Sequence, residues 1–199
     1  MEFDKSDWLR TVKVTLCEIG CEDIWLNDSD EFGDFPTNLI QNLLKEKFLV
    51  QWHNDFALQS HPDKKLRTYS KFKTRFQLEK YLIVLKDVNV RKNFTKLRIS
   101  AHNLNIEVGR HKRPKKIPEQ ERICDTCKEI ENEYHYVIEC NKFNETRKKL
   151  FTNMSEIFIN FQMLNSENKF IMLMASDDPE TSMEMAKFIQ ETVKIRGKL

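Results

Sequence analysis

Three cysteines and one histidine between residues 124 and 140 constrain this chain more than any other feature of its sequence. They are Cys124, Cys127, His135 and Cys140, in the pattern C-x2-C-x7-H-x4-C. A two-residue gap lets one tight turn present two thiolates, and a histidine and cysteine near a helix start can supply the other two ligands. Because Zn²⁺ prefers such a tetrahedral set, the pattern predicts a structural zinc site. Four protein ligands leave no open coordination position for catalysis.

Two other interpretations of these four residues stay open at this point. The cysteines could be small buried apolar residues beside a solvated imidazole, or they could serve a redox or disulfide role. The cluster holds three of the five cysteines of the chain, and charged residues flank it where buried apolar cysteines are not expected. Density and spacing therefore favour a metal. Cys17 and Cys21 have no further ligand nearby and are predicted to be free cysteines of a helix.

Composition favours helices over a β-sandwich or barrel. The 199 residues include 14 Phe and are 40% hydrophobic, which is enough for a core, but only four Gly and five Pro are available for turns. The predicted fold is mainly α, an irregular helical domain with a small zinc-stapled loop–helix module. The sequence also predicts a loop over residues 27–36.

Apolar residues at helical spacing predict several of the helices. One is expected over residues 6–19, ending at Gly20, and a second from Pro36 until His61-Pro62. Short apolar stripes follow in "FQLEKYLIVLKD" and "VRKNFTKLRIS", with charges of the second stripe facing outward. The last two helices should begin near Glu133 and at a cap formed by Asp178 or Thr181.

The sequence carries no feature of a membrane or secreted protein. No apolar run approaches membrane-spanning length, and the amino terminus "MEFDKSDWLR" lacks the basic and apolar parts of a secretory signal. We therefore expect a protein of a reducing compartment, nuclear or cytoplasmic and not secreted, in which cysteines bind metal or remain free.

The net charge of +2 conceals a strong asymmetry along the chain. An acidic N-terminal helical region, residues 1–63, carries a net charge of −8, and a basic helical region with a linker, residues 64–116, carries +14. Residues 117–199, net −4, divide into a zinc-binding module at 117–150 and a C-terminal helical region at 151–199. Such a concentration of positive charge attracts phosphate backbones.

The densest positive charge lies in "RHKRPKK", residues 110–116, which we call the basic run. It ends just before the predicted zinc module. Short basic segments of this kind contact nucleic acid, but they also occur as solvated linkers and as nuclear-import signals.

The order of these motifs resembles a known family. The segments "KLRTYSKFK", "FQLEKYL", "KLRISAHNLNIEVGRH", "IPEQERICDTC", "EYHYVIEC" and "FNETRKKLF" are similar to the zinc-binding region at the C-terminal end of reverse-transcriptase polyproteins from LINE-type, non-LTR retrotransposons. "DWLRTVKVTLCEIGCEDIWLN" and "MAKFIQETVKIR" resemble the helices at either end of that region. The resemblance covers nearly the whole chain.

The resemblance implies a nucleic-acid-binding module that helps such an element to hold its RNA or target DNA. It supports the same four metal ligands and implies RNA or DNA, a reverse-transcriptase domain, or another protein as partner. Candidate phosphate contacts, including the lysines of the basic run, are Arg98, Arg110, His111, Lys112, Arg113, Lys115 and Lys116. The seven-residue gap before His135 departs from the four-residue gap of retroviral zinc knuckles, so the base-stacking rules of those knuckles do not transfer.

Sequence motifs of the common enzyme classes are missing. The adjacent Asp177 and Asp178 precede a proline and lack the strand context of a polymerase site, and neither a P-loop nor a G-x-S-x-G motif occurs. We therefore expect a protein without catalytic activity of its own. The alternative to nucleic-acid binding is a zinc-stabilised protein-interaction scaffold, in which the acidic N-terminal region could contact a basic partner.

Overall fold

The computed structural model describes residues 5–26, 37–59, 65–175, 177–197 and 199. It divides into two compact units, Met1–Ala57 and Leu58–Leu199. The loop predicted over residues 27–36 and the helix end predicted at His61-Pro62 lie outside the described residues. The regions delimited at 64–116, 117–150 and 151–199 all belong to the second unit.

The first unit contains α1 (Lys5–Glu18), α2 (Asp23–Leu26) and α3 (Thr37–Gln59). The chain leaves α1 through Gly20, whose φ of 70° suits a residue without a Cβ atom. Cys17 belongs to α1, but Cys21 lies beyond the end of that helix, whereas the sequence predicted both to be free cysteines of a helix. Both thiols are free, as predicted.

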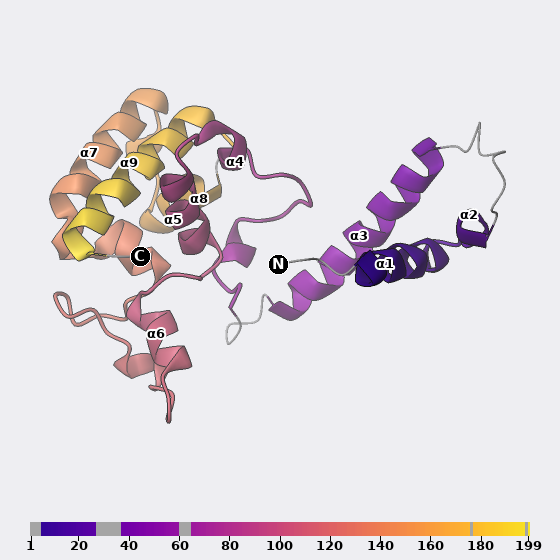
Figure 1. The fold of residues 1–199 in the computed structure, drawn as a ribbon. Helices are drawn as coiled ribbons and strands as arrows, with labels where there is room; N and C mark the ends of the chain where they lie inside the picture. Colours follow the sequence, from indigo (N-terminus) through magenta and orange to yellow (C-terminus); the bar gives the residue numbers. More distant parts are fainter. Residues whose placement is uncertain (1–4, 27–36, 60–64, 176, 198) are drawn as a thin grey trace. The chain divides into compact units, whose positions relative to one another are not determined.

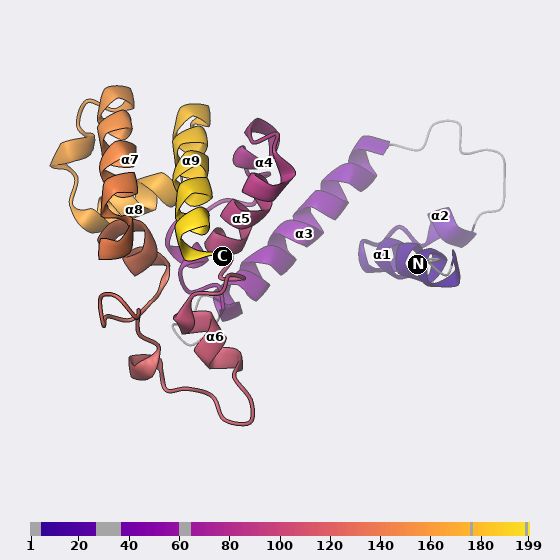
Figure 2. The same ribbon diagram turned by 60° about the vertical axis from the view of Figure 1, so that its left-hand side comes forward.

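The second unit is built from α4 (Tyr81–Val84), α5 (Val88–Arg98), α6 (Asn105–His111), α7 (Asn144–Ile157), α8 (Ser166–Ala175) and α9 (Pro179–Arg196). Helix α9 lies between α7 on one side and α4 and α5 on the other (Figures 1 and 2). Helix α6 and the segment after it lie at one end of this layer (Figure 1). The described residues contain one isolated antiparallel bridge, Ile123 to Ile130, and no named strand, so the mainly α prediction is confirmed.

The α9 helix begins at one of the two caps that its sequence predicts. The Oδ2 atom of Asp178 accepts a hydrogen bond of 2.7 Å from the Thr181 amide, which makes Asp178 the cap, and Pro179 follows in the first turn. The helix ends at Gly197, with a φ of 96°. Met185 on this helix is buried, whereas Met183 is 44% exposed.

Helix α4 is shorter than the apolar stripe of its sequence. Leu78, a residue of that stripe, is 65% exposed and precedes the helix. The Nη1 atom of Arg91 donates to the carbonyl oxygens of Leu82 and Leu85 at 3.3 and 3.1 Å, so this guanidinium satisfies the end of α4. Lys92 is exposed, as predicted for the charged face of α5, but Lys96 donates to the carbonyl oxygen of Leu199.

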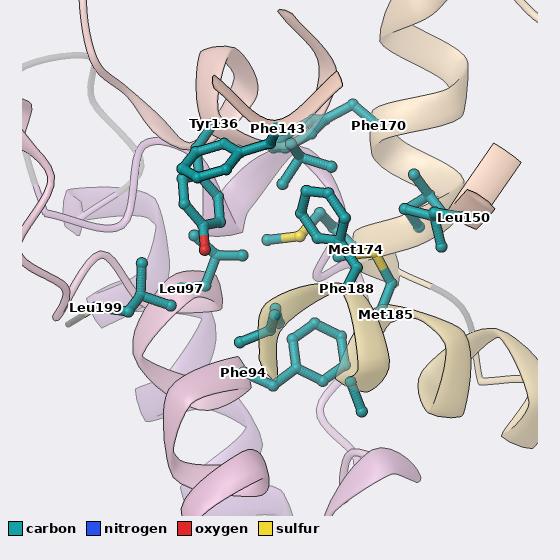
Figure 3. Packing of buried hydrophobic residues seen from close by; sticks show 14 of the residues in the cluster. Phe94, Leu97, Tyr136, Phe143, Leu150, Phe170, Met174, Met185, Phe188 and Leu199 are labelled. Atoms are coloured by element: carbon teal, nitrogen blue, oxygen red, sulfur yellow. The ribbon is translucent and has the colours of Figure 1, made fainter. Parts of the chain in front are cut away.

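Aromatic and methionine side chains fill the space between the helices of the second unit (Figure 3). Phe94 of α5, Met174 of α8 and Phe188 of α9 have at most 2% of their surface exposed. Burial of each such side chain stabilises the fold by roughly 1.5 to 3 kcal/mol. Tyr136 also belongs to this core, where its hydroxyl lies 2.5 Å from Thr192 Oγ1, and it is therefore not free to stack on a base.

No described helix combines the length and the apolar character needed to cross a membrane.

Candidate metal centre and basic run

The first two cysteines of the pattern lie in a tight turn. The Cys124 amide donates to the carbonyl oxygen of Glu129 at 2.7 Å, and the Lys128 amide donates to the carbonyl oxygen of Cys124 at 2.9 Å. Lys128 has a φ of 63°, which lets the chain reverse direction directly after Cys127. The turn places both sulfurs near Cys140, with Sγ–Sγ distances of 3.8 Å from Cys124 and 3.8 Å from Cys127.

The other two residues of the pattern are joined by one turn of π-helix, His135–Glu139. Asn132 starts this helical segment, because its Oδ1 atom accepts a hydrogen bond of 2.8 Å from the His135 amide. The segment begins at Glu133, as predicted. The Cys140 amide donates to the carbonyl oxygen of His135 at 2.7 Å, an i to i+5 bond that closes the wide turn. This bond brings His135 and Cys140, five positions apart in the sequence, to the same side of the turn. It accounts for the four residues between them in the pattern.

The four side chains converge on one point. The potential ligand atoms of Cys124, Cys127, His135 and Cys140, which we call the Cys3His cluster, all lie within 4.8 Å of one another. The cysteines are free, not paired in a disulfide. Both ring nitrogens of His135 are buried without a hydrogen-bond partner in the described structure, although buried polar groups are normally satisfied. A metal ligand requires such an available nitrogen, so the cluster could hold a metal ion.

In the absence of an ion, burial favours the neutral form of the Cys140 thiol. Burial raises the pKa of the Cys140 thiol to about 12, and the neighbouring Cys124 and Cys127 add to this rise, while the Lys142 amide opposes it. A bound divalent cation reverses this balance, because thiolates are its ligands. The Asn141 amide donates to Cys127 Sγ at 3.2 Å and would stabilise negative charge on that sulfur.

Arg147 of α7 attaches the cluster to the helical layer. Its Nη2 atom donates to the carbonyl oxygen of Cys140 at 2.6 Å, and its Nε atom donates to that of Val137 at 2.8 Å. Burial lowers the pKa of this guanidinium, but the nearby Cys140 and Cys127 oppose the shift. Nothing in the sequence around Arg147 marks it for this role, because its partners are backbone atoms.

Glu133 links the cluster to two earlier segments of the chain. Its carboxylate is 1% exposed and accepts hydrogen bonds from His102 Nε2 at 2.9 Å, from Thr68 Oγ1 at 3.1 Å and from the hydroxyl of Ser100. Burial alone would raise the pKa of Glu133. The hydrogen bond and charge of His102, the charge of Arg67 and the Ser100 hydroxyl outweigh burial and lower that pKa to about 2. The carboxylate is thus a charged, fixed part of the structure.

The basic run begins in the last turn of α6 and continues into an exposed loop. Lys112, Arg113, Lys115 and Lys116 are exposed. Arg110 and His111 lie near Glu107 on the same helix. Arg110 Nη1 is 3.6 Å from Glu107 Oε1, and His111 Nε2 is 3.8 Å from Glu107 Oε2. The four exposed cations are therefore available to an anionic partner.

Arg122 holds the base of this loop. The loop closes where the Ile117 amide donates to the carbonyl oxygen of Gly109 at 2.9 Å. Arg122 Nε donates to the carbonyl oxygen of Ile117 at 2.8 Å, and its Nη1 donates to that of Ile106 at 3.1 Å. A Cβ atom on Gly109 would lie 2.7 Å from Arg122 Cγ, so only glycine allows this approach. Since Arg122 is two residues from Cys124, one short segment serves both the loop and the cluster.

The structure places Arg98 in the core and does not support the prediction that Arg98 contacts a phosphate. The residue is 2% exposed, and its Nη2 atom lies 2.7 Å from Glu79 Oε2. Its guanidinium carbon is 4.8 Å from the ring centroid of Phe72 and 4.9 Å from that of Tyr81. Arg98 is thus a buried cation among aromatic rings, paired with Glu79, and not an exposed phosphate contact. It follows Phe94 by four residues on α5, and this spacing is the signal that could have placed it in the core.

The fold and the site together define a mainly helical protein with a Cys3His cluster that could bind a metal ion. Comparisons of this chain with models of protein families, with curated protein sequences and with solved structures find no match.

Proposed function

We propose that the Cys3His cluster holds a structural Zn²⁺ ion and that the chain binds the backbone of RNA or DNA through the basic run, without catalysis of its own. A tetrahedral ion with Zn–S bonds of about 2.3 Å requires sulfurs about 3.8 Å apart. The Sγ–Sγ distances of Cys140 to Cys124 and Cys127 have this value. A reducing compartment, nuclear or cytoplasmic, would keep the thiols available.

The observation that carries the nucleic-acid proposal is the connection between the basic run and the cluster through Arg122. Its guanidinium bonds the backbone at Ile106 and Ile117, on either side of the run, and Cys124 follows two residues later. The metal would therefore orient the exposed cations Lys112, Arg113, Lys115 and Lys116 instead of leaving them on a free linker. A fixed group of cations binds phosphates at a smaller entropic cost than a disordered one. The resemblance to LINE-type retrotransposon proteins supports the same function and a reverse-transcriptase domain as partner.

Two measurements test this proposal. Metal analysis of the purified protein should give one zinc per chain, and Cys124→Ser should lower this zinc content.

Oligonucleotide affinity measured over a series of salt concentrations should fall linearly on a log–log plot. Arg113→Ala should reduce the slope by about 0.9 for duplex or about 0.7 for single strands, since one phosphate contact is lost. Lys148→Ala, an exposed α7 cation outside the basic run, is the matched control.

A second function, a zinc-stabilised protein-interaction scaffold, is favoured by the first unit. Phe48 and Val50 on α3 are 46% and 60% exposed, and residues 1–63 carry a net charge of −8. Exposed apolar side chains in a region of net negative charge suit a partner that is both basic and apolar. Full zinc occupancy without oligonucleotide binding at low salt would contradict nucleic-acid binding and support this function.

A further inference from the structure

A cavity of about 280 Å³ lies beside the start of the basic run. One wall is the segment of residues 100–103 after α5, and the other is the α6 face that carries Glu107, Val108 and His111. Lys65 also lines it. Because His111 is both a lining residue and part of the basic run, a strand held by the run would pass the mouth of the cavity.

Glu107, one of the residues that line this cavity, has an unsatisfied hydrogen-bond acceptor. The Glu107 side chain is 3% exposed, and its Oε1 atom accepts a hydrogen bond of 2.8 Å from Arg67 Nη1. Its Oε2 atom is buried and has no hydrogen-bond partner in the described structure. The ring nitrogen Nε2 of His111 is 3.8 Å away, beyond hydrogen-bond distance. A buried carboxylate oxygen in this state is stabilised by any ligand that donates an N–H group to it.

The remaining lining suits a flat, partly apolar ring. Val108 is 46% exposed and Ala101 is exposed on the opposite wall, and together they offer apolar surface. The imidazole of His111 is 71% exposed, so it can move off Glu107 and stack on an aromatic ligand. Lys65, which is exposed, supplies a cation for a phosphate attached to that ring.

From these features we propose that the cavity binds one unpaired nucleobase with an exocyclic amino group, which donates to Glu107 Oε2. The inference rests on the proposed function, because the basic run must bring the strand. Carboxylates accept hydrogen bonds from base amino groups, as in the recognition of cytosine. Uracil and thymine instead place a carbonyl oxygen on each side of a single N–H, and the carboxylate repels both oxygens.

Binding of oligo(C) and oligo(U) RNA of equal length, at one salt concentration, tests the cavity. We expect oligo(C) to bind about tenfold more tightly, the effect of one hydrogen bond to a charged acceptor. In Glu107→Gln, the amide oxygen takes the place of Oε1 opposite Arg67, so the amide N–H groups face the cavity. The preference should then disappear or reverse toward oligo(U). Glu184→Gln, which changes an ion-paired glutamate of α9, should leave the preference unchanged.

A second variant avoids the Arg67 ion pair, whose loss could lower stability. Ala101→Leu fills the cavity from an exposed position and should also abolish the preference. Equal binding of the two RNAs by the unmodified protein, or a preference that persists in Ala101→Leu, would overturn the cavity inference alone. Absence of binding to either RNA at low salt would overturn the proposed function together with it.

Discussion

The helical layer and the end of the second unit that carries the Cys3His cluster are stabilised in different ways. In the layer, side chains such as Phe94 and Phe188 exclude water from the space between α5, α7 and α9. At the other end, between residues 100 and 140, buried charged groups such as Glu131 and Glu133 take part in hydrogen bonds and ion pairs. Apolar burial has no direction, whereas hydrogen bonds and metal bonds fix angles. The end that carries the Cys3His cluster can therefore hold the four potential ligands and the neighbouring cations in place.

Metal removal should separate the two regions most strongly. Zinc binding contributes on the order of 10 kcal/mol in small zinc peptides, so removal of the proposed Zn²⁺ by a chelator, or Cys140→Ser, should lower the protection of residues 122–140 and release the basic run. Tyr136 of this segment is shared with the layer, but the layer also has core residues of its own such as Phe94 and Phe188, so amides of α7 and α9 should lose less protection. Hydrogen exchange of the metal-bound and metal-free protein provides the measurement. Equal loss of protection in α9 would show that the regions are not independent.

A core substitution should act on the layer instead. Phe188→Ala removes a side chain that is 2% exposed and should lower the free energy of unfolding by about 3 to 5 kcal/mol. Met183→Ala, at a position 44% exposed on the same helix, should change it by less than about 0.5 kcal/mol. Urea unfolding followed by circular dichroism compares the two variants. Similar losses in both would contradict the burial described for α9.

The smallest of the three effects concerns Glu133 and depends on pH. Its pKa is lowered from 4.5 to about 2 in the folded state, so its charged form contributes about 3 kcal/mol at neutral pH. Because the folded pKa lies below the unfolded one, this stability is present above pH 4.5 and is lost as the pH falls toward 2. Glu133→Gln should therefore be less stable than the unmodified protein at pH 7.

The difference between these two proteins should shrink below pH 4.5. Acid would release a bound metal from both proteins alike. The difference between their stabilities is therefore not affected by that release. Thermal unfolding between pH 7 and pH 3 provides the measurement. A difference that does not vary with pH would mean that Glu133 acts through its shape and not through its charge.

The sequence predicted the features that depend on local pattern. Helical periodicity and the cap at Asp178 placed α9, and ligand spacing brought together the four members of the Cys3His cluster. Features that depend on distant partners were not predictable. Arg98 looked like part of a basic surface until Glu79 and the aromatic rings around it were known. Arg122 and Arg147 bond backbone oxygens, which leave no trace in residue identity.

The wide turn between His135 and Cys140 has a consequence for the evolution of such chains. Each residue advances the chain by about 100° in an α-helix and by less in this wider π-helical turn, so deleting one residue here would rotate the following thiol away from its three companions. Insertions would have a similar result. We expect related chains that bind a metal at this cluster to keep this spacing unchanged, even where the surrounding residues are substituted.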